Sequence, residues 1–166
     1  MLIKEESGVE TAISLNLAQP GLGQAYNQLI QELPIINGEK VLTLDRGTSE
    51  ATRGIMARNQ DGHLYVLLGL TDNEEEDEEM SGWTTADNLS FLYSPLTDIP
   101  IPDAFLDRVV GVYSATLFKY KKAIIKEVCR VLKSRGIFNV LYFDQKEKVN
   151  AYYFEIKKED YLKTQG

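Results

Sequence analysis

The chain has little of several residue types that common functional sites require. Its 166 residues include one cysteine, one histidine and five prolines. A single cysteine excludes a disulfide within the chain and a thiolate metal cage, and Cys129 lies in an apolar helical pattern. A catalytic triad or a Cys-His pair would have to use His63, which lies in the turn QDGHLY before an apolar strand. We therefore expect an ordinary turn residue at His63 and a reduced, cytoplasmic environment.

Basic side chains and long apolar runs are also scarce. The chain has 18 basic and 25 acidic residues and a net charge of −7, and six of the acidic residues form the run Glu74–Glu79. A nucleic-acid-binding domain usually has a basic face, whereas the densest basic stretch here, residues 119–135, fits the solvated side of one helix. No apolar run approaches the ~18 residues of a membrane span. We expect neither nucleic acid nor a membrane as a partner.

The length and the 43% apolar content suit a single domain over residues 1–166 with its own core. Residues 1–37 are expected to be a helical N-terminal segment, because apolar residues recur at helical spacing from Leu22 to Leu33. The acidic residues 73–87 are expected to form a flexible loop, because their charge density opposes packing. This loop lacks the spaced oxygens of a calcium site, so we expect no metal.

Apolar strands alternate with helical patterns along the rest of the chain. The expected strands are residues 41–44, 64–70, 89–93, 108–115, 137–143 and 149–156. One expected helix runs from Thr48 or Ser49 to about Asn59, and another runs from Lys119 to Ser134, with Gly136 placed to end it. Strands that alternate with helices need crossover connections, so the sequence predicts an α/β fold with a mostly parallel sheet in three layers.

A more specific pattern lies in the second half of the chain. An apolar-Pro-apolar-Pro-Asp segment, a Phe and an Asp, a strand, a helix ending in Arg-Val-Leu-Lys and a glycine turn follow one another. The residues concerned are Ile99–Asp103, Phe105, Asp107, Arg130–Lys133 and Gly136. In this order and spacing they resemble the second half of a class I S-adenosylmethionine-dependent methyltransferase of the small-molecule type. The resemblance extends from Gly38 to about Phe143 and implies the Rossmann-like methyltransferase fold.

The segment Gly38–Gly54 has the layout of the cofactor-binding strand, turn and helix of that family. There, the first strand ends in an acidic residue and a turn with three alternating glycines follows, which lets the backbone approach the methionine part of the cofactor. Here the acidic position falls on Thr43 and the glycine positions fall on Asp45, Gly47 and Ser49. Asp45 adds a negative charge where the ligand carboxylate would pass, and such a pair repels by about 1 kcal/mol at ~4 Å in water and by more where water is excluded.

The other two cofactor contacts of the family are also altered. The acid that holds the ribose aligns with Thr71, one residue before Asp72, and the acid that meets the adenine amino group aligns with Ser94 or Pro95. Each charged hydrogen bond contributes about 1.5–3 kcal/mol, so losing two or three lowers the affinity by roughly two to six decades. The residues that the resemblance places at the cofactor site are Asp45, Gly47, Ser49, Thr71, Asp72 and Ser94.

Two functions remain open from the sequence. The first is a methyltransferase-like module with weak or absent S-adenosylmethionine binding, which is non-catalytic and acts through protein contacts. The second is an active S-adenosylmethionine-dependent methyltransferase that acts on a small molecule, for which no catalytic residue can be named.

The family fold usually finishes with a helix and an antiparallel hairpin after its fifth strand. Only 23 residues follow Phe143, so we expect the sheet to be truncated after strand five, with residues 149–156 as one further strand near an edge. An uncovered edge leaves backbone groups unpaired. We therefore expect a homodimer or a protein partner that pairs with the edge of this last strand.

Overall fold

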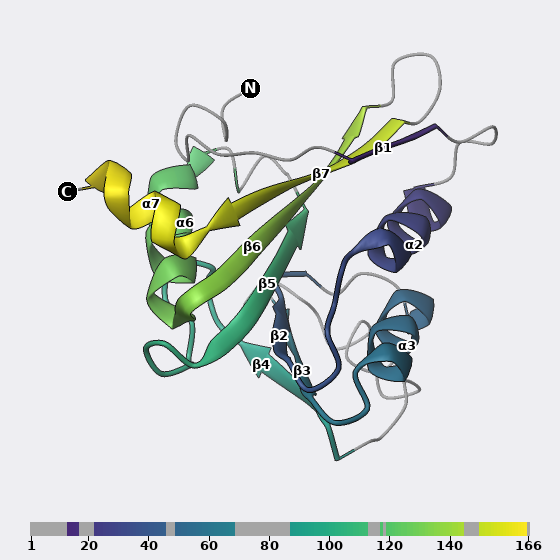
Figure 1. Cartoon of the computed structure of the whole chain (residues 1–166), viewed down its shortest axis with the longest axis horizontal. Coiled ribbons are helices and arrows are strands. Elements are labelled where there is room, and N and C mark those ends of the chain that lie inside the picture. The colour runs from purple at the N-terminus through teal and green to yellow at the C-terminus, as the bar shows by residue number, and fades with distance from the viewer. Residues whose placement is uncertain are drawn as a thin grey trace.

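The computed structural model describes residues 13–16, 22–45, 49–68, 87–112, 117, 119–144 and 150–165. Within these ranges, one sheet of seven strands lies between two layers of helices, with α2 and α3 on one side and α6 and α7 on the other (Figure 1). The strands are β1 (Ile13–Asn16), β2 (Lys40–Thr43), β3 (His63–Leu68), β4 (Leu89–Tyr93), β5 (Leu106–Val112), β6 (Leu132–Asp144) and β7 (Asn150–Lys157). The helices are α2 (Leu22–Glu32), α3 (Ser49–Arg58), α6 (Lys121–Val131) and α7 (Lys158–Gln165).

The strand order across the sheet is β1-β7-β6-β5-β2-β3-β4. Five neighbouring strands are parallel to one another, namely β6, β5, β2, β3 and β4. Strand β7 is antiparallel to β6, and β1 is antiparallel to β7. The prediction of a three-layer α/β fold of the Rossmann-like methyltransferase type, with a mostly parallel sheet, is confirmed. The central strand β2 lies between β5 and β3, so the residue that follows it enters the middle of the carboxyl edge of the sheet.

Two apolar clusters, one on each face, hold the helices to the sheet. Neighbouring residues of a strand point to opposite faces. In β2, Val41 accordingly belongs to the cluster with α2 and α3, and Leu42 belongs to the cluster with α6 and α7. Both side chains have no solvent exposure. Burial on both faces explains why this strand reads as an apolar run without polar alternation.

The boundary between α6 and β6 differs from the expected one. The helix ends at Val131, three residues before Ser134, because Leu132 is already extended, with φ −77° and ψ 142°, and pairs with Leu106 of β5. The register then shifts and resumes at Ile137, so the residues between form an irregular stretch at the start of β6. A Cβ at Gly136 would lie 2.8 Å from Leu132 side-chain atoms. Glycine serves close packing here and does not end the helix.

Two short elements were not predicted, and one of them changes the sheet edge. β1 lies within the segment expected to be helical, and it pairs with the first half of β7, from Ile13 opposite Tyr153 to Asn16 opposite Asn150. The expectation of an uncovered edge along the last strand is therefore wrong for residues 150–153. The reason is a pairing between chain ends far apart in sequence, which local patterns do not show. The other unpredicted element is α7, and the acidic loop expected at 73–87 lies outside the described residues except for Asp87.

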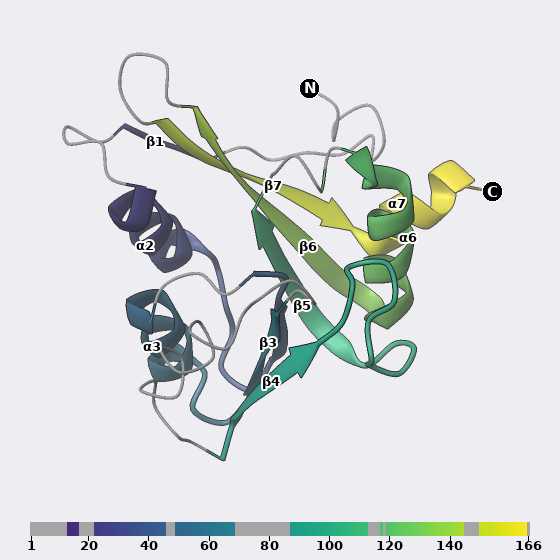
Figure 2. The same cartoon turned by 180° about the vertical axis from the view of Figure 1, so that it is seen from behind.

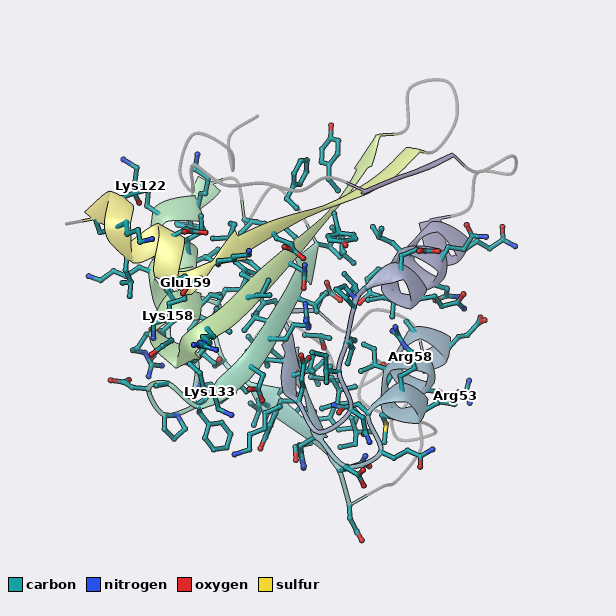
Figure 3. All side chains as sticks on the ribbon, in the orientation of Figure 1. Arg53, Arg58, Lys122, Lys133, Lys158 and Glu159 are labelled. Atoms are coloured by element: carbon teal, nitrogen blue, oxygen red, sulfur yellow. The ribbon has the colours of Figure 1, made fainter. Side chains whose placement is uncertain are left out.

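The guanidinium group of Arg58 connects α3 to the end of α2. It donates to the backbone oxygens of Ile30 at 2.6 Å, Leu33 at 2.9 Å and Gln31 at 3.2 Å. The last carbonyls of a helix lack partners within the helix and carry its partial negative charge, so a cation satisfies them. Figure 3 shows Arg58 on the side of α3 that faces α2, with Arg53 directed away from it.

Replacing this arginine is expected to weaken the packing of α2 on α3. Arg58→Ala should lower the free energy of unfolding by about 1–2 kcal/mol, because three carbonyl groups lose a charged donor. Urea denaturation followed by circular dichroism measures this change. Arg53→Ala on the same helix is the matched control, since Arg53 is exposed, and we expect a change below about 0.5 kcal/mol. Equal effects of the two substitutions would contradict the assignment.

Candidate functional site

Three segments bring polar groups to the carboxyl edge of the parallel strands. Asp45 follows β2, Val112 ends β5 and Ser94 follows β4. The Leu44 N–H donates to the Val110 oxygen at 2.8 Å, which extends the pairing of β2 with β5 and fixes the backbone just before Asp45. Ligands of open α/β sheets bind outside this edge. It is therefore the place where a functional site is expected.

The carboxyl group of Asp45 is enclosed rather than solvated. Its Oδ1 accepts a hydrogen bond from the Tyr26 hydroxyl of α2 at 3.0 Å. Its Oδ2 is buried and has no hydrogen-bond partner in the part of the chain that the structure describes. Burial raises the pKa of Asp45 from 3.8 to about 6, and the bonds from Tyr26 and from the Val112 N–H oppose that rise. Burial and the neighbouring Asp45 also raise the pKa of Tyr26.

A second contact joins α2 to the start of α3. The Asn27 amide donates to Glu50 Oε2 at 2.8 Å, and Glu50 lies in the first turn of α3. Free N–H groups at a helix start favour an anionic ligand. Glu50 supplies a carboxylate of the chain itself in this first turn, where it interacts favourably with the same partial positive charge.

The structure locates some of the predicted cofactor residues and leaves others untested. Ser49 is the first residue of α3, and Ser94 is 6% exposed at the end of β4. The Ser94 N–H donates to the Leu68 oxygen at 3.2 Å, and its hydroxyl donates to the Pro95 oxygen at 3.1 Å. Asp45 and Ser94 thus lie at the same sheet edge, on strands separated by β3. The remaining predicted residues, Gly47, Thr71 and Asp72, lie outside the described residues.

Sequence reasoning missed Tyr26 as a site residue. Its spacing in α2 identified it as part of the buried stripe, and it is indeed 7% exposed. A tyrosine on such a stripe differs from leucine or isoleucine because its hydroxyl needs a hydrogen-bond partner when it is buried. This requirement was the signal in the sequence that could have identified Tyr26 as a site residue. The partner, Asp45, lies 19 residues away in sequence.

His63 lies at the opposite edge of the sheet, as expected. It begins β3 and pairs with Lys40, the first residue of β2. Its Nε2 lies 2.8 Å from the Ser90 hydroxyl, and burial together with the Lys40 charge lowers its pKa. Among the described residues, no three His, Cys, Asp or Glu side chains gather as metal ligands, and no helix combines the length and the apolar character that a membrane crossing requires.

The residues of the family pattern lie at the same end of the sheet as His63, where β5 begins. They hold the backbone there. Arg130 of α6 donates to the backbone oxygens of Ile99 and Ile101 at 2.8 and 2.9 Å and pairs with Asp103 at 2.7 Å. Glu127 accepts from the Ile99 N–H at 2.6 Å and pairs with Arg130 at 2.7 Å. The hydrogen bond from Arg130 is the first cause of the lowered pKa of Glu127. The pattern therefore holds the proline-rich segment against α6.

Among the described residues of the turn, Asp45 is the one that opposes the anionic end of S-adenosylmethionine. The resemblance places a glycine at this position, where the backbone approaches the methionine carboxylate. Asp45 has a Cβ, a largely buried carboxyl group and an oxygen with no described donor. A second carboxylate at this position would meet a like charge in surroundings that screen poorly.

The three-layer fold, with its polar groups at the carboxyl edge of the parallel strands, defines an α/β protein of the Rossmann-like methyltransferase class. The sequence pattern of the family described as methyltransferase domain matches residues 46–140, which is more than half of the chain. The chain therefore belongs to the methyltransferase domain family.

Comparison with individual proteins agrees with this family. The chain is 31% identical over 112 residues to the ubiquinone/menaquinone biosynthesis C-methyltransferase UbiE of Chromobacterium violaceum, a match that covers 65% of this chain and 44% of UbiE. A putative methyltransferase solved in complex with the Haloferax volcanii Trm112 activator has a TM-score of 0.61 and 23% identity over 72% of this chain and 52% of that one. A SAM-dependent methyltransferase from Aquifex aeolicus has a TM-score of 0.60 and 15% identity over 78% of this chain and 88% of that one. The chain spans less than half the length of UbiE.

Proposed function

We propose that this domain is a methyltransferase-family module whose S-adenosylmethionine site is weakened by Asp45, and that it acts through protein contacts without transferring a methyl group. The observation that carries the proposal is the Asp45 carboxyl group, which stands at the position of a family glycine with one buried oxygen unpaired. The Asp45 carboxyl group stands where the methionine carboxylate of S-adenosylmethionine would pass, so it lowers the affinity for the cofactor.

The electrostatic contribution can be bounded from the pKa of Asp45. With a pKa of about 6, this carboxyl group is ionised at neutral pH. A ligand carboxylate at ~4 Å then meets a repulsion of about 1 kcal/mol in water and more at a lower dielectric. Protonation of Asp45 would relieve this repulsion at a cost of about 1.4 kcal/mol at pH 7, so the charge raises the dissociation constant by about fivefold to about tenfold.

The protein-contact part of the proposal has separate support. One structural neighbour is a putative methyltransferase solved in complex with an activator protein, and this supports a protein partner for the present chain.

The single cysteine, Cys129, is buried in α6, and burial raises the pKa of its thiol to about 11. A chain with one buried cysteine forms no internal disulfide and needs no oxidising compartment, and we propose a cytoplasmic location.

An active methyltransferase on a small molecule is the second candidate. The identity to UbiE favours it, as does one feature of Asp45: its unpaired Oδ2 is an acceptor that the ammonium group of the methionine part would satisfy. In that case Asp45 would attract one end of the ligand while repelling the other. The two candidates therefore predict opposite effects of Asp45 on the affinity for S-adenosylmethionine.

Titration calorimetry of the wild-type chain with S-adenosylmethionine and S-adenosylhomocysteine tests the proposal. Because the repulsion adds to the altered ribose and adenine contacts expected at Thr71 and Ser94, we expect dissociation constants above about 100 μM for both compounds. Values below that limit for either compound would overturn the proposal and favour the active enzyme. Binding of the product analogue alone would also count against it, since both compounds carry the same carboxylate.

A further inference from the structure

A groove with a cationic rim lies on the face of the sheet that bears α6 and α7. Its volume is about 570 Å³, and it is formed by α6, α7 and the residues just before β5. Lys126, Arg130 and Lys158 provide positive charge, and Tyr161 and Leu162 provide apolar surface. Asp103 also lines the groove and pairs with Arg130 at 2.7 Å. Figures 1 and 2 show α6 and α7 side by side at the end of the sheet next to β7. Leu162 is 51% exposed, so the apolar part of the groove is open to solvent.

Basic and acidic residues are unevenly distributed along the sequence. Residues 119–166 contain twelve basic and six acidic side chains, whereas residues 1–118 contain six basic and nineteen acidic ones. The groove lies within the basic part. Figure 3 places Lys122 on α6, Lys158 and Glu159 on α7 and Lys133 below them, so this end of the molecule is mainly cationic. A basic patch on an acidic chain favours association with acidic surfaces.

Three described cations outside this face are already engaged. Lys40 lies 4.1 Å from the centre of the Phe105 ring, Arg58 binds the end of α2, and Arg108 is buried with Glu39 at 3.0 Å. By contrast, Lys122 and Lys126 are exposed on α6. An acidic partner segment would thus find exposed positive charge beside the groove, chiefly at Lys122 and Lys126. Arg130 is already paired with Asp103 and Glu127.

The chain itself contains a segment of matching chemistry. Glu74–Glu79 supplies six carboxylates, and two apolar side chains, Met80 and Trp83, follow within four residues. Carboxylates match the cationic rim of the groove, and an apolar anchor matches the wall formed by Leu162 and Tyr161. The strands that flank this segment in sequence, β3 and β4, lie at the opposite end of the sheet from β7 and α7. A second copy can bring its segment to the groove without crossing its own sheet.

We propose that the groove between α6 and α7 binds the acidic segment, residues 74–83, of a second copy of this chain. The contact is head to tail, because each copy offers one groove and one segment, so it produces rings or short open chains. This inference rests on the protein-contact role proposed above, but it is independent of cofactor affinity. Calorimetry with S-adenosylmethionine decides the earlier proposal, and self-association decides this one.

Sedimentation velocity of the full chain over a range of concentrations is the primary test. We expect association with a dissociation constant of ~100 μM at low salt and its loss at about 0.5 M salt, because ions screen the contact. Lys126→Glu should weaken the association about tenfold. Arg135→Glu makes the same charge change at an exposed position that does not line the groove, and we expect less than about a twofold effect from it.

Two further measurements separate this contact from general charge attraction. Leu162→Ser leaves the charge unchanged and should weaken association severalfold, because it removes apolar contact. The double variants Lys122→Glu/Lys126→Glu and Glu75→Lys/Glu78→Lys should each be monomeric, yet form a one-to-one complex when mixed. A wild-type chain that stays monomeric at low salt would overturn the proposal. Equal effects of Lys126→Glu and Arg135→Glu, or no complex in the mixture of folded variants, would also overturn it.

Discussion

Asp45→Gly is expected to bind S-adenosylmethionine about fivefold to thirtyfold more tightly than the wild-type chain at about pH 7.5. The substitution removes the Cβ and the carboxyl group from the turn and restores the residue that the family has there. It also removes a charge that is ionised at neutral pH, since the pKa of Asp45 is about 6. Titration calorimetry of both chains at about pH 7.5 measures the difference, because the carboxyl group is then almost fully ionised.

Two substitutions identify which property of Asp45 is responsible. Asp45→Asn removes the charge and keeps the side chain, so it should give part of the gain that glycine gives. Tyr26→Phe removes the 3.0 Å hydrogen bond and keeps the carboxyl group, so it should give no gain. If Asp45→Gly binds no better than the wild type, the carboxyl group does not limit binding. If it binds more weakly, Asp45 holds the ligand's ammonium group and the second candidate function is favoured.

Asp45→Asn should also change how stability depends on pH. A carboxyl group whose pKa is raised on folding stabilises the native state at low pH, where it is protonated, and this stabilisation is lost as the pH rises through the native value. For Asp45 the window runs from 3.8 to about 6. Between about pH 4.5 and 7.5 the wild type should lose on the order of 2 kcal/mol relative to the asparagine variant.

Urea denaturation of both chains across this pH range measures the difference. The relevant quantity is its change with pH, since asparagine introduces its own constant cost by placing an amide near the Val112 N–H. Tyr26→Phe is a control whose effect on the pH dependence should be opposite to that of Asp45→Asn, because the Tyr26 hydrogen bond lowers the pKa of Asp45. Loss of this hydrogen bond should extend the pH dependence of stability to higher pH. A constant difference between wild type and Asp45→Asn would show that the carboxyl group is not perturbed.

The fold was predictable because its strongest sequence signals are local. β4 covers the expected residues 89–93, and β2 and β3 lie within one or two residues of the expected ranges. The family pattern at Ile99–Asp103 and Arg130 is recognisable because those residues hold the backbone: Arg130 binds two carbonyl groups of the proline-rich segment. Residues that hold the fold indicate the family without indicating whether the cofactor binds.

The elements that were missed depend on contacts between distant residues. β1 has four residues, and its pairing partner β7 lies more than 130 residues away in sequence. The early end of α6 depends on the pairing of Leu132 with Leu106, which overrides a helical pattern that continues to Ser134. Neither contact leaves a periodic signal in the local sequence.

For the candidate site, the sequence predicts a position but not the surroundings of its side chains. Alignment with the family placed Asp45 at a glycine position of the turn. The alignment could not show that the carboxyl group would be enclosed by Tyr26 of α2 and the end of β5, because that depends on how α2 packs. The raised pKa follows from this burial, which is a property of the folded chain.

A carbon-detected NMR titration of the Asp45 carboxyl group is the most direct test of the account, because its burial and charge underlie both the weak cofactor site and the pH dependence. We expect a pKa of about 6 for this group in the native chain. A pKa near or below the ordinary value of about 4 would mean that the carboxylate is solvated or paired, and it would contradict the central claim.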